Sequence, residues 1–158
     1  MKTIHEIIRR SGRLRNLKEN PIRIEKDSNE TLEIRYIGKG PRGKDAIAVL
    51  LFAQIESELR RVVEMRFEVF SYINWKTKDG DLVSEKVTQY CPYLYIQESH
   101  GFRDEVYELD EKGKIRHTNQ KLLEWLNVIT YLWDGIFEDH GYLNSNDSDN
   151  QSEGKANE

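Results

Sequence analysis

The sequence predicts an α+β domain in which an antiparallel sheet of about five or six strands packs against a long C-terminal helix and a short N-terminal helix. Short stretches of alternating polar and apolar residues, typical of strands, recur through the first two thirds of the chain. Glycine-containing turns separate several of them. From Asn119 to His140, apolar residues instead recur at every third or fourth position, which is typical of an amphipathic helix.

A short helix is expected at the start of the chain. Thr3 and Glu6 have the spacing of a capping box, in which each side chain would bond the backbone N–H of the other residue. Arg9 and Arg10 fall in the last turn, where cations suit the negative end of the helix dipole. Gly12 then suits a left-handed end to the helix.

Strands are expected over most of the following region. Asp79-Gly80 predicts a tight hairpin turn, and Pro92 indicates an edge position or a bulge. Residues 46–65 are compatible with either a helix or a strand hairpin, because short apolar runs cannot be resolved by their period. The other strands are expected at 22–24, 32–37, 65–69, 87–96, 106–109 and 114–116.

The final helix has the clearest pattern. Thr118 or Asn119 can cap its start and Gly141 its end. Its apolar residues fill about half of the helix circumference, so the helix should pack across the sheet, or cover the sheet and also contact a second copy of the chain. The arc consists of Leu122, Leu123, Trp125, Leu126, Ile129, Leu132, Trp133, Ile136 and Phe137.

Length and charge limit the class of protein. A chain of 158 residues suits one domain, expected at 1–143. Residues 144–158 hold four acids and one lysine, and we expect a disordered acidic tail there. The net charge of −4 argues against a bulk basic nucleic-acid binder, and no run approaches the ~20 apolar residues of a membrane span. With Cys91 as the single cysteine, no intramolecular disulfide can form; a cytoplasmic location is expected, and the role of the thiol stays open.

No set of residues predicts catalysis. Gly38 and Gly43-Lys44 have the spacing of a phosphate-binding loop, but Asp45 replaces the Ser or Thr that binds Mg²⁺, and Pro41 removes an N–H donor. The four histidines show neither helical pairing nor a cysteine partner, so no metal site is expected. We therefore expect no catalytic residue, no metal and no cofactor.

An aromatic set is the first candidate for a protein-binding surface. Exposed tyrosines offer a large contact area at low entropic cost, which suits an interface with a protein partner. The alternative is that these residues pack under the C-terminal helix. The set comprises Tyr90, Tyr93, Tyr95, Phe102 and Tyr107.

A basic set supports a second hypothesis, nucleic-acid binding through phosphate contacts. Its members are Arg9, Arg10, Arg13, Arg15, Lys18, Lys39, Arg42 and Lys44. A third hypothesis is a small metal-dependent nuclease that uses Glu64 and Glu68. Both share one face of a presumed strand with Arg66, and alternating charges on a solvated face are the ordinary explanation of that pattern.

Several segments resemble a family of small, functionally uncharacterised bacterial proteins that are frequent on plasmids, phages and other mobile elements. The resemblance implies an α+β domain with an antiparallel sheet and a C-terminal helix, and it transfers no catalytic residue. The family has a Gly-Asp turn and an Asp-Pro step, which imply a hairpin, where this chain has Ser57-Glu58 and Val62-Val63. The sequence therefore still allows a helix in this region. The similar segments are 48–54, 63–67, 92–97 with 106–107, and the pattern Leu123-x-x-Leu126 to Trp133-x-x-x-Phe137-x-x-x-Gly141-Tyr142.

The leading hypothesis from the sequence is a cytoplasmic, non-enzymatic binding or regulatory protein that acts on an unidentified protein partner. The absence of a convergent catalytic set and the tyrosine-rich strand motivate it. The mobile-element resemblance implies a host or plasmid protein as the partner, in defence or counter-defence.

Overall fold

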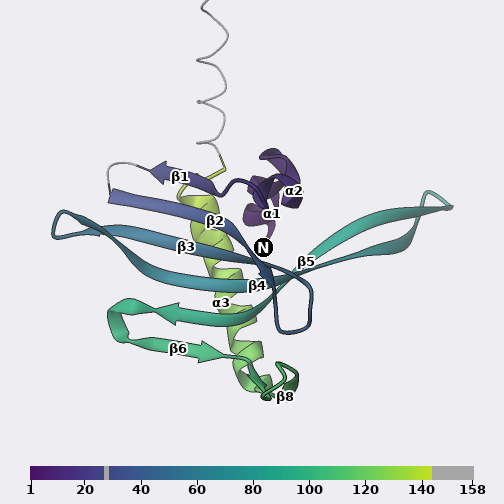
Figure 1. Cartoon of the computed structure of the whole chain (residues 1–158). Helices are drawn as coiled ribbons and strands as arrows, with labels where there is room; N and C mark the ends of the chain where they lie inside the picture. Colours follow the sequence, from purple (N-terminus) through teal and green to yellow (C-terminus); the bar gives the residue numbers. More distant parts are fainter. Residues whose placement is uncertain (27–28, 144–158) are drawn as a thin grey trace, which may run out of the picture.

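The computed structural model describes residues 1–26 and 29–143, and the predicted acidic tail at 144–158 lies outside the described residues. The described chain is α+β, as predicted (Figure 1). Six strands form one antiparallel sheet in the order β1-β2-β3-β4-β5-β6, and β7 and β8 form a second, two-stranded sheet. Every strand of the large sheet therefore pairs with its neighbour in sequence.

The elements follow one another with short connections. They are α1 (Lys2–Arg10), α2 (Arg13–Leu17), β1 (Ile22–Lys26), β2 (Glu30–Lys39), β3 (Asp45–Ile55), β4 (Glu58–Lys78), β5 (Asp81–Gln97), the 3₁₀ turn η2 (Glu98–His100), β6 (Phe102–Glu105), β7 (Tyr107–Leu109), β8 (Ile115–Thr118) and α3 (Gln120–Asp139).

The ambiguous region 46–65 forms two paired strands rather than a helix. β3 and β4 join through a two-residue turn in which Glu56 and Ser57 both have positive φ, 51° and 68°. Such turns are usually marked by Asn-Gly or Asp-Gly, so Glu-Ser carried no recognisable signal. The predicted turn at Asp79-Gly80 is confirmed, with φ values of 53° and 90°.

The core lies between one face of the large sheet and the helices. Alternating residues of the strands point toward α1 and α3, as the two-residue period requires. Aromatic rings continue the core along α3. The ring centres of Trp133 and Phe137 lie 5.5 Å apart and those of Phe137 and Tyr142 5.7 Å apart, both in edge-on geometry. Buried members of the core include Ile4, Ile7, Ile24, Leu32, Ile34, Ile47, Val49, Met65, Phe67, Tyr95, Leu126 and Phe137.

The N-terminus of α1 is capped from α3, so the predicted capping box is wrong. Asp134 accepts hydrogen bonds from the backbone N–H groups of Lys2 at 2.7 Å and Thr3 at 2.9 Å. The Thr3 hydroxyl instead donates to the Asp134 carbonyl. A carboxylate on α3 thus accepts hydrogen bonds from the unpaired N–H groups in the first turn of α1, for which the capping box had been expected to provide the acceptor. At the other end, Gly12 adopts the expected left-handed φ of 92°.

Of the two candidate caps of α3, Asn119 is the one used, because its side chain accepts from the Leu122 N–H at 3.0 Å. Only part of its apolar arc reaches the core, however. Leu126 and Phe137 are buried, whereas Trp125, Leu132 and Ile136 are exposed. The helix therefore packs on the sheet through the inner part of its arc, as predicted, and the outer part of the arc is left exposed.

Strands β4 and β5 extend well past the rest of the sheet. The pairing of β3 with β4 ends at Glu68, and β6 pairs with β5 only from Leu94 onward. Residues 72–87 thus form a two-stranded ribbon that projects from the body, which we call the arm (Figure 1). Near its base, the register between β4 and β5 shifts between Arg66 and Phe67, so Pro92 lies beside a bulge and ahead of the segment of β5 that pairs with β6.

Candidate protein-interaction site

Two of the predicted aromatic residues pack beneath the helices. Tyr95 is buried beneath α3, where its ring meets Trp125 edge-on at 5.6 Å. Tyr90 lies beneath α1, with its hydroxyl 3.2 Å from Nδ1 of His5. Burial raises the pKa of Tyr90 to about 12. For these two tyrosines the structure shows the packed arrangement rather than an exposed surface.

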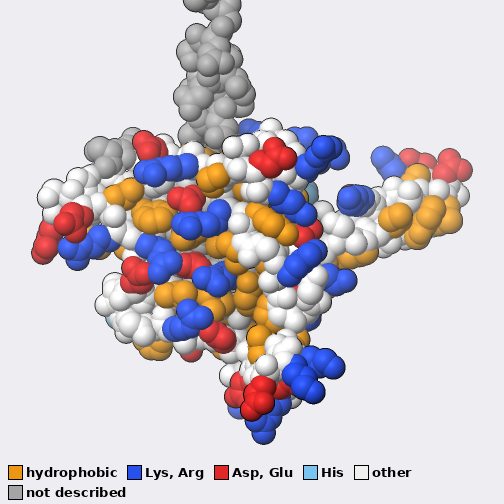
Figure 2. Space-filling model, in the orientation of Figure 1, with side chains coloured by type: hydrophobic (Ala, Val, Ile, Leu, Met, Phe, Trp, Pro, Cys, Tyr) orange, Lys and Arg blue, Asp and Glu red, His pale blue; other side chains and the backbone are white. Residues whose placement is uncertain are grey.

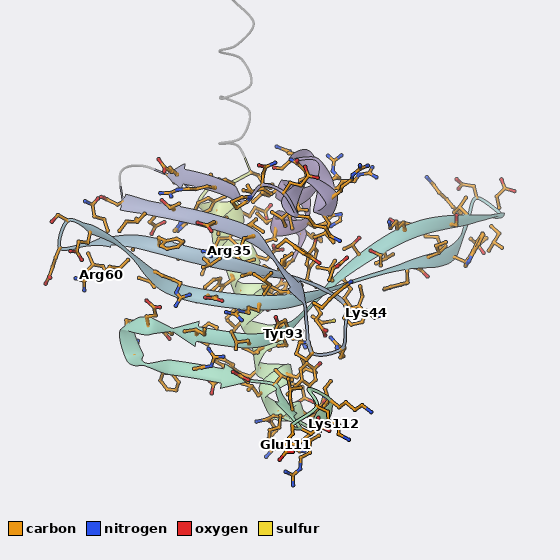
Figure 3. The ribbon with its side chains drawn as sticks, in the orientation of Figure 1. Arg35, Lys44, Arg60, Tyr93, Glu111 and Lys112 are labelled. Carbon is orange, nitrogen blue, oxygen red and sulfur yellow. The ribbon has the colours of Figure 1, made fainter. Side chains whose placement is uncertain are left out.

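The other three aromatic residues are placed apart. Tyr93, labelled in Figure 3, lines a pocket of about 310 Å³ beside the β2–β3 loop. Tyr107 lines the same pocket. Burial raises the pKa of both hydroxyls. Phe102 is exposed on the edge strand β6. Tyr107 is itself a buried member of the core, so among the five aromatic residues only Phe102 is exposed.

On the sheet face opposite the helices, which we call the open face, basic and acidic side chains lie among hydrophobic ones (Figure 2). Glu64, Arg66 and Glu68 share this face, as predicted from their spacing. The two carboxylates are not solvated, however: Glu64 is 3% exposed and Glu68 is fully buried. Arg66 Nε donates to Glu64 at 2.5 Å, and Arg61 donates to the same carboxylate. Guanidinium groups therefore cover carboxylates that lie deeper in the face.

The glycine-rich loop between β2 and β3 folds onto Glu68. The backbone N–H of Arg42 donates to Glu68 Oε1 at 2.6 Å, and its Nε donates to Oε2 at 2.5 Å. Gly40 lies so close that a Cβ atom there would be 2.4 Å from Glu68 Cγ. A protein carboxylate thus takes the backbone donor that a phosphate-binding loop would offer to its ligand. No local sequence signal links this loop to a residue so far along the chain.

Five of the eight predicted basic residues have carboxylate partners within the described chain. Arg9 and Arg10 both bond Glu6 and hold its pKa down at about 2. Lys18 and Lys39 converge on Asp45, whose pKa is lowered chiefly by Lys39.

Arg42 binds Glu68, and Lys44 lies over the Phe70 ring at 5.8 Å. Arg13 and Arg15 are exposed on α2. The structure therefore brings the basic segment and the loop together at Asp45, with much of their charge neutralised.

The arm carries several exposed apolar side chains. Ile73, Trp75 and Leu82 are 62%, 61% and 69% exposed. The register pairs Trp75 with Ser84 and Thr77 with Leu82, so all three apolar side chains lie on one face of the ribbon. Hydrophobic side chains line the arm, and charged ones gather at its tip (Figure 2).

The arm has no excess of either charge. Its three lysines are matched by three acidic residues, and Lys76 forms an ion pair with Glu85 across the ribbon. The sequence indicated the turn at Asp79-Gly80 but not that its strands leave the sheet. Strand length in a sequence does not reveal where the neighbouring strands end, so the arm could be found only from the sheet pairing.

Comparison with protein-family models, with curated proteins and with solved structures finds no match to this chain. Within residues 1–26 and 29–143, no helix has the length and apolar composition needed to cross a membrane. The same described residues hold no group of three or more His, Cys, Asp or Glu side chains placed to bind a metal ion together.

Proposed function

We propose that this protein is a non-enzymatic accessory protein that binds a protein partner through the apolar face of its arm. The observation that carries the proposal is the exposure of Ile73, Trp75 and Leu82 on one face of a projecting ribbon. Contiguous exposed apolar residues on a folded protein mark interaction sites. Tryptophan is also enriched among the residues that dominate binding energy.

The architecture of the arm favours a protein as the partner. A ribbon held by its own strand pairing loses little conformational freedom on binding, so less of the contact energy is lost to ordering. Its balanced charge lacks the lysine and arginine excess that phosphate contacts require. The mobile-element resemblance extends the proposal to a host or plasmid protein as the partner, in defence or counter-defence.

A photo-crosslinking experiment tests the arm. A benzoylphenylalanine introduced at Trp75 should give a discrete adduct with one protein in extracts of the organism that carries the gene. The same probe at Asn74, which points to the opposite face of the ribbon, should give little of that adduct. Equal adducts from both positions, or no discrete adduct from Trp75, would count against the proposal.

Once the crosslinked protein is purified, its affinity provides a quantitative check. Trp75→Ala should weaken binding by roughly 30-fold, the equivalent of about 2 kcal/mol for a central interface tryptophan. Asn74→Ala is the matched control and should change the affinity less than threefold. Both variants should keep the melting temperature of the parent protein, because residue 75 lies outside the core.

A further inference from the structure

Helix α3 has a second row of side chains that faces outward, and within the described chain the only ring contact of this row is that of Trp125 with Tyr95. Six residues of this row are spaced alternately four and three positions apart. This is the spacing of the interface positions, or seam, along which two helices pack side by side in a parallel or antiparallel pair. At about 100° per residue, this row points away from buried Leu126, Thr130 and Phe137. We call it the outer stripe; it comprises Lys121, Trp125, Val128, Leu132, Gly135 and Asp139.

The middle of the outer stripe is apolar and open. Trp125, Val128 and Leu132 are 44%, 58% and 54% exposed. Ile136, on the adjoining flank, is also exposed. Helices that pack side by side usually carry large apolar side chains at successive seam positions.

Gly135 gives the stripe a notch. Glycine is the poorest helix-forming residue after proline, so its place in the interior of a helix calls for a reason. No packing within the described chain supplies one, because a Cβ atom at Gly135 would meet nothing within 4 Å. A missing side chain on an exposed seam leaves room for a large side chain from a second helix.

We propose that two copies of this chain form a dimer by antiparallel packing of α3 along the outer stripe. In this arrangement Val128 meets the partner's Leu132, and Trp125 fills the notch at the partner's Gly135. Lys121 then lies beside the partner's Asp139, so an ion pair closes the seam at both ends. Each contact occurs twice, as the two-fold symmetry of an isologous dimer requires.

The residue order of the stripe selects the antiparallel orientation. A parallel pair would set Lys121 against Lys121 and Asp139 against Asp139, which repel. It would also place two tryptophans in one layer and leave a void between two glycines, which costs packing energy. Antiparallel helix dipoles oppose each other favourably as well.

The contact is small, so the dimer should be weak. A helix of 20 residues is about 30 Å long, which limits the interface to the low end of the size range for specific complexes. Glu124 would also lie near the partner's Glu138, a like-charge contact. We expect a dissociation constant on the order of 1–100 μM. This dimer is independent of the arm and would present two arms to a partner protein.

Sedimentation of the full chain across a concentration series tests the proposal. The wild-type protein should pass from monomer to dimer, and Leu132→Asp should weaken association at least 30-fold. Asn127→Asp, an equal charge change on the polar flank of the same helix, should leave it unchanged. A monomer at several hundred micromolar, or a dimer that tolerates Leu132→Asp, would refute the outer stripe as the interface.

Two further variants test the pairing itself. Gly135→Leu should weaken the dimer at least tenfold while the fold is retained, because a leucine fills the space that Trp125 of the other chain needs. Lys121→Asp should weaken association, and Lys121→Asp combined with Asp139→Lys should restore it. A parallel dimer would show no such loss and rescue. Trp75→Ala should leave the dimer intact, so loss of association in that variant would assign it to the arm instead.

Discussion

Glu68 illustrates how a single residue organises the open face. Its carboxylate is fully buried on the side of the sheet that carries no helix, where the β2–β3 loop covers it. A buried charge is tolerated only when paired and hydrogen-bonded, and Arg42 supplies both a backbone and a side-chain donor. The Arg42 guanidinium also lies 4.4 Å from the centre of the Phe70 ring, which holds it over the carboxylate.

Gly40→Ala should therefore destabilise the protein. The added Cβ would lie 2.4 Å from Glu68 Cγ, so either the loop or the buried carboxylate must move. We expect a loss of about 1–3 kcal/mol in the free energy of unfolding, the usual cost of overpacking, measured by chemical denaturation.

Gly135→Ala is the matched control for that substitution. Its Cβ would meet no atom within 4 Å, and alanine is the better helix former, so stability should hold or rise by up to about 1 kcal/mol at protein concentrations too low for association. Equal effects of the two substitutions would show that the contact with Glu68 is not the cause.

At the scale of elements, α1 and α3 are joined through Asp134. Its side chain caps the N-terminus of α1, and its backbone carbonyl accepts the Thr3 hydroxyl. The arginines at the other end of α1 bind Glu6, the residue that the capping-box pattern assigned to the N-terminus. One helix thus completes the hydrogen bonding of the other, although some 130 residues separate them in the chain.

Asp134→Ala should lower the free energy of unfolding by about 0.5–2 kcal/mol, the range for loss of an N-cap. Protection of the amides of Lys2 and Thr3 against hydrogen exchange should fall with it. Asn127→Ala, on the exposed polar flank of α3, is the control and should preserve both stability and protection. Unchanged protection at Lys2 and Thr3 in Asp134→Ala would contradict the capping role.

At the scale of the whole molecule, charge separates the two binding hypotheses. The chain is net negative, and most of its predicted phosphate-contacting residues bind carboxylates of the same molecule. A phosphate that contacts such a residue would compete with a carboxylate that already neutralises its charge. The apolar face of the arm needs no such exchange to bury its surface.

We accordingly expect no mobility shift of DNA or RNA at low ionic strength with micromolar protein. A shift that weakens steeply as salt is added, and that is lost in Arg13→Glu/Arg15→Glu, would favour the nucleic-acid hypothesis instead. Those two arginines are the sensitive positions, because they are exposed on α2. Lys112→Glu/Lys114→Glu, an equal change in net charge at exposed positions outside the basic set, serves as the control.

Local chemistry in the sequence determined the α+β class, the turn at Asp79-Gly80, the start of α3 at Thr118 or Asn119 and the shared face of Glu64 and Glu68. Each of these depends on residues a few positions apart, where helix and strand periods or turn preferences act directly. The choice between helix and strand at 46–65 was not local, because the apolar run is buried by pairing with β2 and β4.

Only the tertiary structure decided which exposed surfaces remain. It buried Tyr95 under α3, left the outer half of the α3 arc uncovered and carried the β4–β5 ribbon beyond its neighbours. It also joined Gly40 to Glu68 and Asp134 to α1. The physical reason is that an apolar side chain favours burial, but the sequence around it does not show what will cover it. That depends on where the other helices and strands of the chain begin and end.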